Sequence, residues 1–480
     1  MIMMEKIKQI LVNKFGFTNF KPGQEEVVNH LLNQKDTLAI LPTATGKSLT
    51  YQLTSYCLPG VTLVVSPLIS LMEDQVQQLA KIGEKNAVAI NSLMDFHQRK
   101  FVLKHIKRFK FIFVSPELLA NQEVLTILEG LSISLLVVDE AHCISQWGND
   151  FRPDYLNLRT VKNRLNHPLT LALTATATSP VIKDIEKQLF GNEFEVVTLP
   201  IDRENIFLSV VNTEDKLNYL IDFLNHHHGP GIIYFSSKAE AESIASELNR
   251  LTSLKIGIYH GDVLPEDRIK IQQQFLKSSL QILCATNAFG MGINKADIRF
   301  VIHYHLPDSL ENYVQEFGRA GRDGLQSVSI ILYQEGDERI HRFLHDDTFQ
   351  QKSELLSLKH KTRQEMKTIY PNLSNLQKKW LVQIANTDWD WDNFEKQLQN
   401  RKTNHFQNIV KMMDYIRLTT CRRNFILEAF DNQNIKTEEK KQCCDLCNNE
   451  LPDLTEVQKV NDNEENLKTA EQIIRNLFLL

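Results

Sequence analysis

Short apolar runs alternate with longer segments of helix-like character along the first part of the chain. Apolar runs without polar alternation are typical of strands that are buried on both faces of a parallel sheet. Helical patterns between such runs provide the connections that parallel strands need. This pattern predicts an α/β unit in which helices cover a parallel sheet. The strand-like runs are residues 37–41, 62–65, 111–114, 133–138 and 169–173.

A second series of such runs follows residues 202–205 and predicts a second α/β unit of similar size. After Asp346 the sequence becomes helical, rich in lysine and poor in strands. Three of the four tryptophans lie within residues 380–391, where we expect them to pack this helical region. The strand-like runs of the second unit are residues 231–235, 256–259, 280–284, 300–303 and 328–332.

These patterns divide the chain into four parts: residues 1–203, 204–345, 346–452 and 453–480. The first two are the α/β units, the third is the helical region, and the fourth is an acidic tail. The tail ends in an apolar segment, residues 473–480, which fits either a docking helix or a partner site. The histidine run 226–228 precedes Gly-Pro, so we interpret it as an exposed helix end rather than a metal site.

Length and composition are those of an ordinary globular protein. The 480 residues predict roughly three domains of ~150 residues each. No apolar stretch is long enough to span a bilayer, and the first residues lack a signal-peptide pattern, so we expect a cytoplasmic protein without a membrane partner. The net charge of -5 argues against a surface that coats nucleic acid throughout, but it allows a local basic groove.

The end of the run 133–138 carries the first candidate chemistry. Asp139 and Glu140 follow this run at the carboxyl end of a predicted strand, where open α/β sheets bind ligands. Two adjacent carboxylates there suit two tasks: Asp139 helps to hold Mg²⁺, and Glu140 positions an attacking water. Trp147, Phe151 and Arg152 follow and offer stacking faces and a guanidinium to a single-stranded nucleic acid. The alternative is an acidic strand end followed by an ordinary aromatic turn.

A phosphate-binding loop is predicted where the run 37–41 ends. The segment Pro-Thr-Ala-Thr-Gly-Lys-Ser occupies residues 42–48. Backbone N–H groups at a helix N-terminus cradle phosphates, Lys47 reaches the outer phosphates and Ser48 ligates Mg²⁺. The general pattern has glycine where this chain has Leu41, but the strand, loop and helix context supports the prediction. The candidate nucleotide contacts of this loop are Thr43, Thr45, Gly46, Lys47 and Ser48.

Two further segments carry candidate chemistry. Residues 315–324 place Arg319 and Arg322 three positions apart, on one side of a helical turn, where arginines can stabilise the charge of a phosphoryl transfer. A surface salt-bridge network is the alternative. Near the end of the chain, four of the seven cysteines form a cluster that is typical of a metal site rather than of disulfides in a cytosolic protein. They are Cys421, Cys443, Cys444 and Cys447.

Together these motifs resemble the RecQ family of superfamily 2 DNA helicases over about residues 8–450, in family order. The resemblance implies that Phe17, Lys21 and Gln24 recognise adenine. It identifies residues 139–142 as the Walker B box, which adds His142 to the catalytic set. It implies that residues 147–153 form the aromatic-rich loop that couples DNA binding to hydrolysis. It adds Gln315 to the catalytic group and identifies Arg322 as the arginine finger. It also implies that Thr286 contacts DNA and that the cysteine cluster is a zinc module.

The chain departs from the family pattern at several positions. Lys21 replaces a usual arginine, and Ala44 and Thr45 replace glycines. Asn149 stands where the family usually has histidine, so the coupling loop is expected to be retuned. Adjacent Cys443 and Cys444 strain a tetrahedral site, which makes Cys443 the weakest predicted zinc ligand.

The spacing of the motifs also departs from the family. The segment 324–421 looks longer than usual, which predicts an enlarged helical region. The residues after Cys447 leave no room for winged-helix and C-terminal helical domains, so we expect the strand-separating hairpin to be missing.

The resemblance implies two tandem RecA-like domains and a helical zinc-binding module. It predicts an ATP-dependent 3′–5′ DNA helicase that uses ATP, Mg²⁺ and Zn²⁺ on single-stranded DNA and duplex junctions in recombination and repair. A single-strand-binding protein or other repair proteins are further candidate partners, and the expected location is the cytoplasm, at the nucleoid. The alternatives are an RNA helicase or a DNA-stimulated translocase with weak unwinding. A non-enzymatic DNA-bridging protein is disfavoured because it needs no complete ATPase set.

Overall fold

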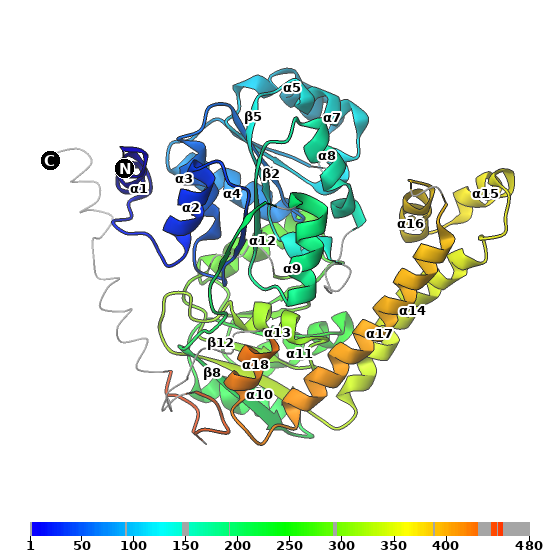
Figure 1. Ribbon diagram of the computed structural model, residues 1–480. Coiled ribbons are helices and arrows are strands. Elements are labelled where there is room, and N and C mark those ends of the chain that lie inside the picture. Colours follow the sequence, from blue (N-terminus) through cyan, green and yellow to red (C-terminus); the bar gives the residue numbers. More distant parts are fainter. Residues whose placement is uncertain are drawn as a thin grey trace.

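The computed structural model describes residues 2–91, 94–145, 153–191, 193–290, 295–386, 389–430, 443–448 and 450–454. Two α/β domains lie one above the other in Figure 1, and a helical arm extends from the lower one. Among the described residues, no helix has the length and apolar character needed to cross a membrane.

The first domain is built on a seven-stranded, all-parallel sheet with the strand order β3-β4-β2-β5-β6-β1-β7. Side chains alternate between the two faces of a strand. Leu136 and Val138 therefore pack beneath α7, α8 and α9, whereas Leu135 and Val137 pack beneath α2, α3 and α4. The strands are β1 (Thr37–Ile40), β2 (Val61–Val65), β3 (Ala87–Ile90), β4 (Phe111–Val114), β5 (Ile133–Val138), β6 (Leu169–Thr174) and β7 (Glu195–Thr198). The helices are α1 (Ile2–Phe15), α2 (Gln24–Leu32), α3 (Lys47–Ser55), α4 (Ile69–Lys81), α5 (Phe96–Lys104), α6 (Pro116–Leu119), α7 (Gln122–Glu129), α8 (Leu158–Arg164) and α9 (Ser179–Ile185), with short turns η1 (Ile106–Arg108), η2 (Ala141–Ile144), η3 (Pro153–Asn157) and η4 (Glu186–Phe190).

The second domain has a six-stranded, all-parallel sheet with the order β10-β11-β9-β12-β13-β8. One face of this sheet packs on α10 and α11, and the other packs on α12, α13 and the C-terminal helices. The two parallel sheets confirm the predicted α/β class. The strands are β8 (Ile206–Asn212), β9 (Gly231–Tyr234), β10 (Ile256–Tyr259), β11 (Ile282–Ala285), β12 (Phe300–His303) and β13 (Ser327–Tyr333). The helices are α10 (Lys216–His226), α11 (Lys238–Leu251), α12 (Pro265–Leu276) and α13 (Leu310–Phe317). The histidine run begins at the end of α10, where His226 is exposed.

A helical arm follows the second sheet. Helices α14 and α17 run side by side away from the body of the molecule, and α15 and α16 form its tip (Figure 1). The arm has its own apolar core, in which Trp380, Trp391 and Phe394 are buried and Trp389 packs against them, so the predicted packing role of these tryptophans is confirmed. The returning α17 and α18 join the core of the second sheet. The elements are η5 (Asp337–Arg339), α14 (Ile340–Leu356), α15 (Arg363–Ile369), η6 (Tyr370–Asn372), α16 (Asn375–Asn386), α17 (Trp391–Ile416) and α18 (Arg422–Ala429).

The chain passes from the first sheet to the second between β7, which ends at Thr198, and β8, which begins at Ile206. The position predicted as the start of the third part, Asp346, falls inside the continuous helix α14. Helix α14 therefore links the second sheet to the arm without a break. Most of the predicted tail, including the apolar segment 473–480, lies outside the described residues.

Candidate nucleotide site and metal centre

The phosphate loop lies between β1 and α3 and is held by residues at the start of α2 and just before it. Gly46 and Ala44 both have left-handed backbone angles, with φ of 75° and 72°. The Gln24 side-chain amide donates to Thr45 O at 2.6 Å and Gly46 O at 3.2 Å. A Cβ atom at Gly46 would lie 2.8 Å from Gln24 Nε2, and the left-handed φ at this position would strain any other residue, so glycine is favoured here. Lys21 Nζ completes the support with a 2.8 Å hydrogen bond to Ala44 O.

Asp139 and Glu140 follow β5, at the edge of the sheet where the phosphate loop lies. Asp139 continues the strand ladder with an N–H to Val65 O hydrogen bond of 2.9 Å, and its carbonyl accepts the Tyr155 hydroxyl at 3.0 Å. Glu140 then adopts a left-handed φ of 48°, which turns the chain sharply at this point. Burial, and then the charge of Glu140, raise the pKa of Asp139 to about 7, while Lys47 acts in the opposite direction. A cation in front of Asp139 would restore its charged form.

His142 lies behind these carboxylates. It is buried, and its Nδ1 atom is 3.0 Å from Thr174 Oγ1 and 3.4 Å from Glu140 Oε2. Thr174 ends β6 and donates its hydroxyl to Thr176 O at 2.8 Å. His142 therefore links the carboxylate turn to the end of the neighbouring strand rather than lining the open space.

Both α/β domains line one cavity of about 520 Å³. Its first-domain wall comes from the phosphate loop, the carboxylate turn and α4, and its second-domain wall comes from α13 and the loop that follows. The two walls touch where Thr43 Oγ1 donates to Gly318 O at 2.9 Å. The lining residues that the sequence singled out are Phe17, Lys21, Gln24, Thr43, Gly46, Lys47, Ser48, Asp139, Glu140, Gln315, Arg319 and Arg322.

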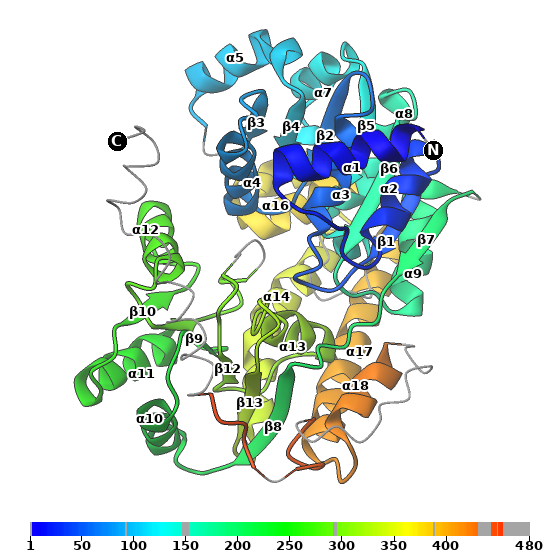
Figure 2. The same ribbon diagram turned by 90° about the vertical axis from the view of Figure 1, so that its left-hand side faces the viewer.

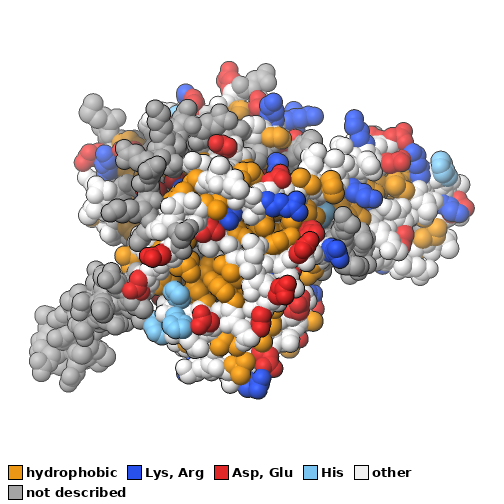
Figure 3. Space-filling view, turned by 90° about the horizontal axis from the view of Figure 1, so that it is seen from below, with side chains coloured by type: hydrophobic (Ala, Val, Ile, Leu, Met, Phe, Trp, Pro, Cys, Tyr) orange, Lys and Arg blue, Asp and Glu red, His pale blue; other side chains and the backbone are white. Residues whose placement is uncertain are grey.

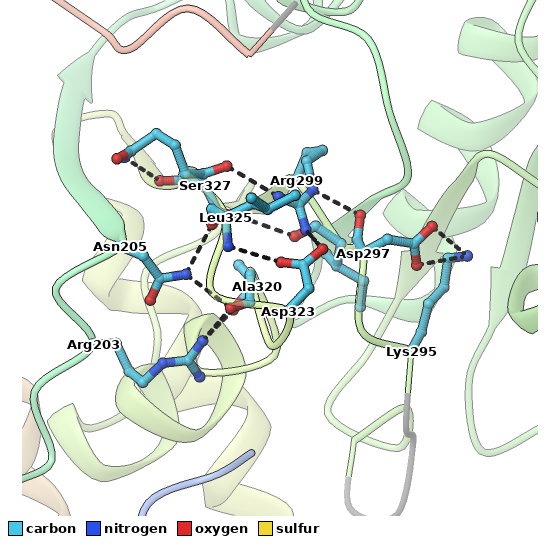
Figure 4. Close-up of polar contacts among 12 residues, drawn as sticks. Arg203, Asn205, Lys295, Asp297, Arg299, Ala320, Asp323, Leu325 and Ser327 are labelled. Carbon is cyan, nitrogen blue, oxygen red and sulfur yellow. Dashed lines mark hydrogen bonds and ion pairs between the residues drawn. The ribbon is translucent and has the colours of Figure 1, made fainter. Parts of the chain in front are cut away.

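The loop that carries the two cavity arginines is fixed through its backbone carbonyls (Figure 4). Arg203 donates to Gly318 O, Ala320 O and Gly321 O at 2.8, 2.9 and 2.7 Å. Asn205 donates to Gly321 O and Leu325 O, both at 2.8 Å. Arg203 and Asn205 come from the segment between the two sheets, so the interdomain connection itself sets the position of the loop.

The second-domain wall of the cavity concentrates positive charge. Arg319 is buried and donates from Nη1 to Gly290 O. Burial, and then the neighbouring charges of Arg319 and Arg203, lower the pKa of Arg322. An anion entering the cavity would relieve this repulsion, so the geometry suits a polyphosphate held between the loop of one domain and the arginines of the other.

The four clustered cysteines form a second candidate centre. Their sulfur atoms all lie within 4.8 Å of one another, and Cys443 Sγ is 3.5 Å from Cys421 Sγ. A tetrahedral zinc site with Zn–S bonds of about 2.3 Å places its sulfurs about 3.8 Å apart. The donor set and its spacing therefore fit zinc, and Cys443 lies within the cluster despite its adjacency to Cys444.

This cluster is attached to the second sheet and to the interdomain connection. Cys444 forms a parallel bridge with Leu208 of the edge strand β8, and Asp445 N donates to Leu208 O at 3.0 Å. Arg423 donates to Ile206 O at 2.6 Å and Arg203 O at 3.0 Å, and it pairs with Asp202. The cysteine module thus contacts the residues that hold the arginine loop.

Three family models match consecutive parts of the chain. Residues 21–185 match the DEAD/DEAH box helicase model, residues 215–324 match the helicase conserved C-terminal domain, and residues 379–448 match the RecQ zinc-binding domain. The Probable ATP-dependent DNA helicase RecS of Bacillus subtilis (strain 168) is 50% identical over 337 residues, which cover 70% of this chain and 68% of that protein. The ATP-dependent DNA helicase RecQ of the same strain is 40% identical over 362 residues, which cover 74% of this chain and 61% of that protein. The chain belongs to the RecQ family of ATP-dependent DNA helicases.

Solved structures share the fold at lower identity. The Mycobacterium smegmatis helicase Lhr, solved with ssDNA and AMP-PNP, has a TM-score of 0.58 and 20% identity over 72% of this chain and 50% of that one. The DUF1998 helicase MrfA, solved with DNA, has a TM-score of 0.59 and 20% identity over 72% of this chain and 53% of that one. These likenesses show a common fold.

The structure brings the RecQ nucleotide motifs together around one cavity. Some of the residues predicted to bind nucleotide or DNA have other contacts in it. Gln24, predicted to bind the adenine edge, uses its amide to hold the phosphate loop in this conformation. Thr45 donates its hydroxyl to Pro42 O at 2.7 Å and does not line the cavity. Thr286 follows β11, is buried, and also lies away from the cavity. Trp147, Phe151 and Arg152 lie outside the described residues, as does Asn149.

Sequence reasoning missed three residues that organise this RecQ site. Arg203 and Asn205 hold the arginine loop, and Tyr155 holds the Asp139 carbonyl. The sequence marked residues 202–205 only as a domain boundary. The sequence could have indicated this role, because Arg203 and Asn205 have long polar side chains at the boundary between the two domains. Such side chains can donate hydrogen bonds to exposed backbone carbonyls of either domain.

Proposed function

We propose that this RecQ-family chain translocates 3′ to 5′ along single-stranded DNA and unwinds duplex or branched DNA in recombination and repair. The proposal is supported chiefly by the cavity that both domains line, because a nucleotide there would join the phosphate loop to the arginines and so couple hydrolysis to domain closure. The DNA substrate makes a single-strand-binding protein a proposed partner and the nucleoid a proposed location.

Each cavity residue has a proposed task. Lys47 binds the outer phosphates of ATP, and Glu140 orients the attacking water. Arg322 stabilises the charge of the transferring phosphoryl group, with Arg319 and Gln315 beside it. Ser48 and Asp139 would hold Mg²⁺, which supplies charge neutralisation at the phosphates when it is bound.

DNA is proposed to contact the aromatic-rich loop through Trp147, Phe151 and Arg152, and the second domain at Thr286. Stacking of bases on the two aromatic rings would report strand occupancy to the carboxylates only a few residues earlier in the chain. Phe17 is proposed to stack on adenine, since it lines the cavity while remaining 53% exposed.

The test compares nucleic acids as activators. We expect ATP hydrolysis to be stimulated strongly by single-stranded DNA, more weakly by duplex DNA and least by RNA, and unwinding to require a 3′ single-stranded tail. Purified full chain is assayed for phosphate release and for strand separation of duplexes with 3′ tails, 5′ tails or forks. Unwinding from 5′ tails alone would refute the proposed polarity.

An RNA helicase is the second candidate. A protein of Acanthamoeba polyphaga mimivirus named as an ATP-dependent RNA helicase is 35% identical over 450 residues, covering 93% of this chain and 72% of that protein. The 2′-hydroxyl separates the two substrates. Stronger stimulation by RNA than by DNA of the same sequence would favour this second function.

For the metal centre, we propose that Cys421, Cys443, Cys444 and Cys447 together hold one zinc ion. We expect one zinc per chain by elemental analysis, and we expect Cys447→Ser to lose zinc and to lower the melting temperature, because the module packs on the core of the second sheet. Cys57→Ser, which changes a cysteine of the first domain far from this cluster, is the control. Protein purified without chelator but free of zinc would contradict the assignment.

A further inference from the structure

Helix α5 and the turn η1 carry a surface that no part of the proposed ATP cycle uses. We define the α5 surface by six residues: Phe96, Lys100, Phe101, Lys104, Lys107 and Arg108. Along the chain, the helix lies between the edge strand β3 and its neighbour β4. Figures 1 and 2 both place it on the side of the first domain that faces away from the second domain.

The two phenylalanines of this surface project into solvent. Phe96 is 64% exposed and Phe101 is 65% exposed. The inward positions of the same segment are filled by Leu103 and Ile106, which are buried in the core of the first domain. The two rings are therefore not needed to hold α5 and η1 on the first domain. Large exposed aromatic side chains at such positions are typical of binding surfaces.

Positive charge predominates around these rings, and the neighbouring carboxylate of Asp95 caps the start of α5 by accepting the Gln98 N–H. Lys100 follows Phe96 by four positions and lies with its Nζ atom 5.9 Å from that ring, while Lys104 follows Phe101 by three positions on the same helix. Some exposed lysines elsewhere pair with carboxylates, as Lys238 does with Asp262 and Lys270 with Asp267. Within the described part of the chain, none of the four cations of the α5 surface has an ion-pair partner.

This concentration of one charge contrasts with the net charge of the whole chain and with the face at the opposite end of the molecule. The whole chain carries a net charge of -5. The opposite end of the molecule, seen from below in Figure 3, shows acidic and basic side chains interspersed. The α5 surface therefore has a local positive potential that attracts polyanions.

We propose that the α5 surface is an accessory binding site for single-stranded DNA, outside the cavity and its cleft. Cations spaced along a helix bind backbone phosphates, and exposed rings stack on bases. A duplex hides its base faces, so the two exposed rings favour a single strand, whose bases can stack on them. The inference rests on the proposed function only in taking DNA as the substrate class.

Two double variants of the full chain separate the contributions of the rings and the charges: Phe96→Ala with Phe101→Ala, and Lys100→Ala with Lys104→Ala. The control, Arg250→Ala with Leu251→Ala, alters an exposed basic and apolar pair on α11. The ligands are labelled oligothymidylates of about 10 and about 40 nucleotides and a labelled duplex DNA. The short oligothymidylate is included because it can occupy only one site at a time. Binding is measured across a salt series, together with melting temperature and stimulated ATPase.

We expect each α5 variant to bind the long oligonucleotide about tenfold more weakly, while binding and stimulation by the short one stay at parent values. For the lysine variant, the slope of log affinity against log salt should fall in magnitude by about 1.4, or about 0.7 per lost phosphate contact. Melting temperatures should match the parent because the altered side chains are exposed.

Several results would overturn the proposal. The first is parent-like affinity of both variants for the long oligonucleotide. The second is an equal loss of affinity for duplex DNA. The third is a loss of affinity in the lysine variant without one in the phenylalanine variant. A parent protein whose ATPase is not stimulated by the short oligonucleotide would instead contradict the proposed function, and the binding comparison would still decide the α5 surface.

Discussion

Replacement of Glu140 by glutamine should lower ATP turnover by about 10³-fold or more while ATP binding stays close to that of the parent. Glu140 lines the cavity beside the phosphate loop, and its Oε2 atom lies 3.4 Å from His142 Nδ1. The carboxylate is therefore held at the cavity wall, where it can orient a water toward the terminal phosphate. Glutamine keeps the shape of the side chain but removes the negative charge that activates the water.

Replacement of Lys47 by alanine should also stop turnover, but by a different route. Lys47 begins α3 at the phosphate loop, so its loss should weaken ATP binding itself. Binding of a fluorescent ATP analogue and phosphate release, measured on both variants, distinguish the two losses. Glu123→Gln, on the exposed first turn of α7, is the isosteric control. Near-parent turnover in either cavity variant would contradict the assigned roles.

Much of the fold could be predicted from the sequence because central strands leave a strong signal. Strand β5, buried along most of its length, is a continuous apolar run, and its position was predicted to the residue. Strands β3 and β7 were missed because both are sheet edges with partly exposed residues, so neither forms a continuous buried run. Strand β8 was missed because it follows β7 through an irregular connection, without the intervening helix that marks most other strands.

The site was predictable where chemistry fixes residue types. Lys47, Asp139 and Arg322 belong to motifs with set spacing, and all three line one cavity. Arg203 could not be predicted because it bonds backbone carbonyls more than a hundred positions away, and carbonyls carry no sequence signal. The Gln24 amide could not be placed because its partners are likewise loop carbonyls, which exist only once the phosphate loop has folded.

Replacement of Arg322 by alanine should lower turnover by about 10³-fold or more, with a much smaller effect on ATP affinity. Arg322 lines the cavity from the second domain, across from the phosphate loop and the carboxylates. Burial beside Arg319 and Arg203 lowers its pKa, so its charge is best stabilised when phosphate charge develops opposite it. The effect should therefore appear in kcat rather than in KM for ATP.

Arg203 should act as a positioning residue for the same step. Its guanidinium bonds three carbonyls of the arginine loop, at Gly318, Ala320 and Gly321, and it does not line the main cavity. Arg203→Ala should therefore lower kcat by about tenfold while leaving KM for ATP near the parent value. In a double variant with Arg322→Ala, Arg203→Ala should lower kcat little further. The position of the arginine loop affects kcat only while Arg322 is present to contact the phosphates.

The matched control for both substitutions is Arg250→Ala, which removes an exposed arginine on α11 far from the cavity. ATPase kinetics in the presence of single-stranded DNA and melting temperatures are compared for the parent and the four variants. Fully additive losses in the double variant would show that Arg203 acts independently of Arg322, and a loss confined to ATP affinity in Arg322→Ala would remove the arginine-finger role. Since Arg423 of the cysteine module bonds the carbonyls of Arg203 and Ile206, zinc loss should produce a weaker version of the Arg203 phenotype.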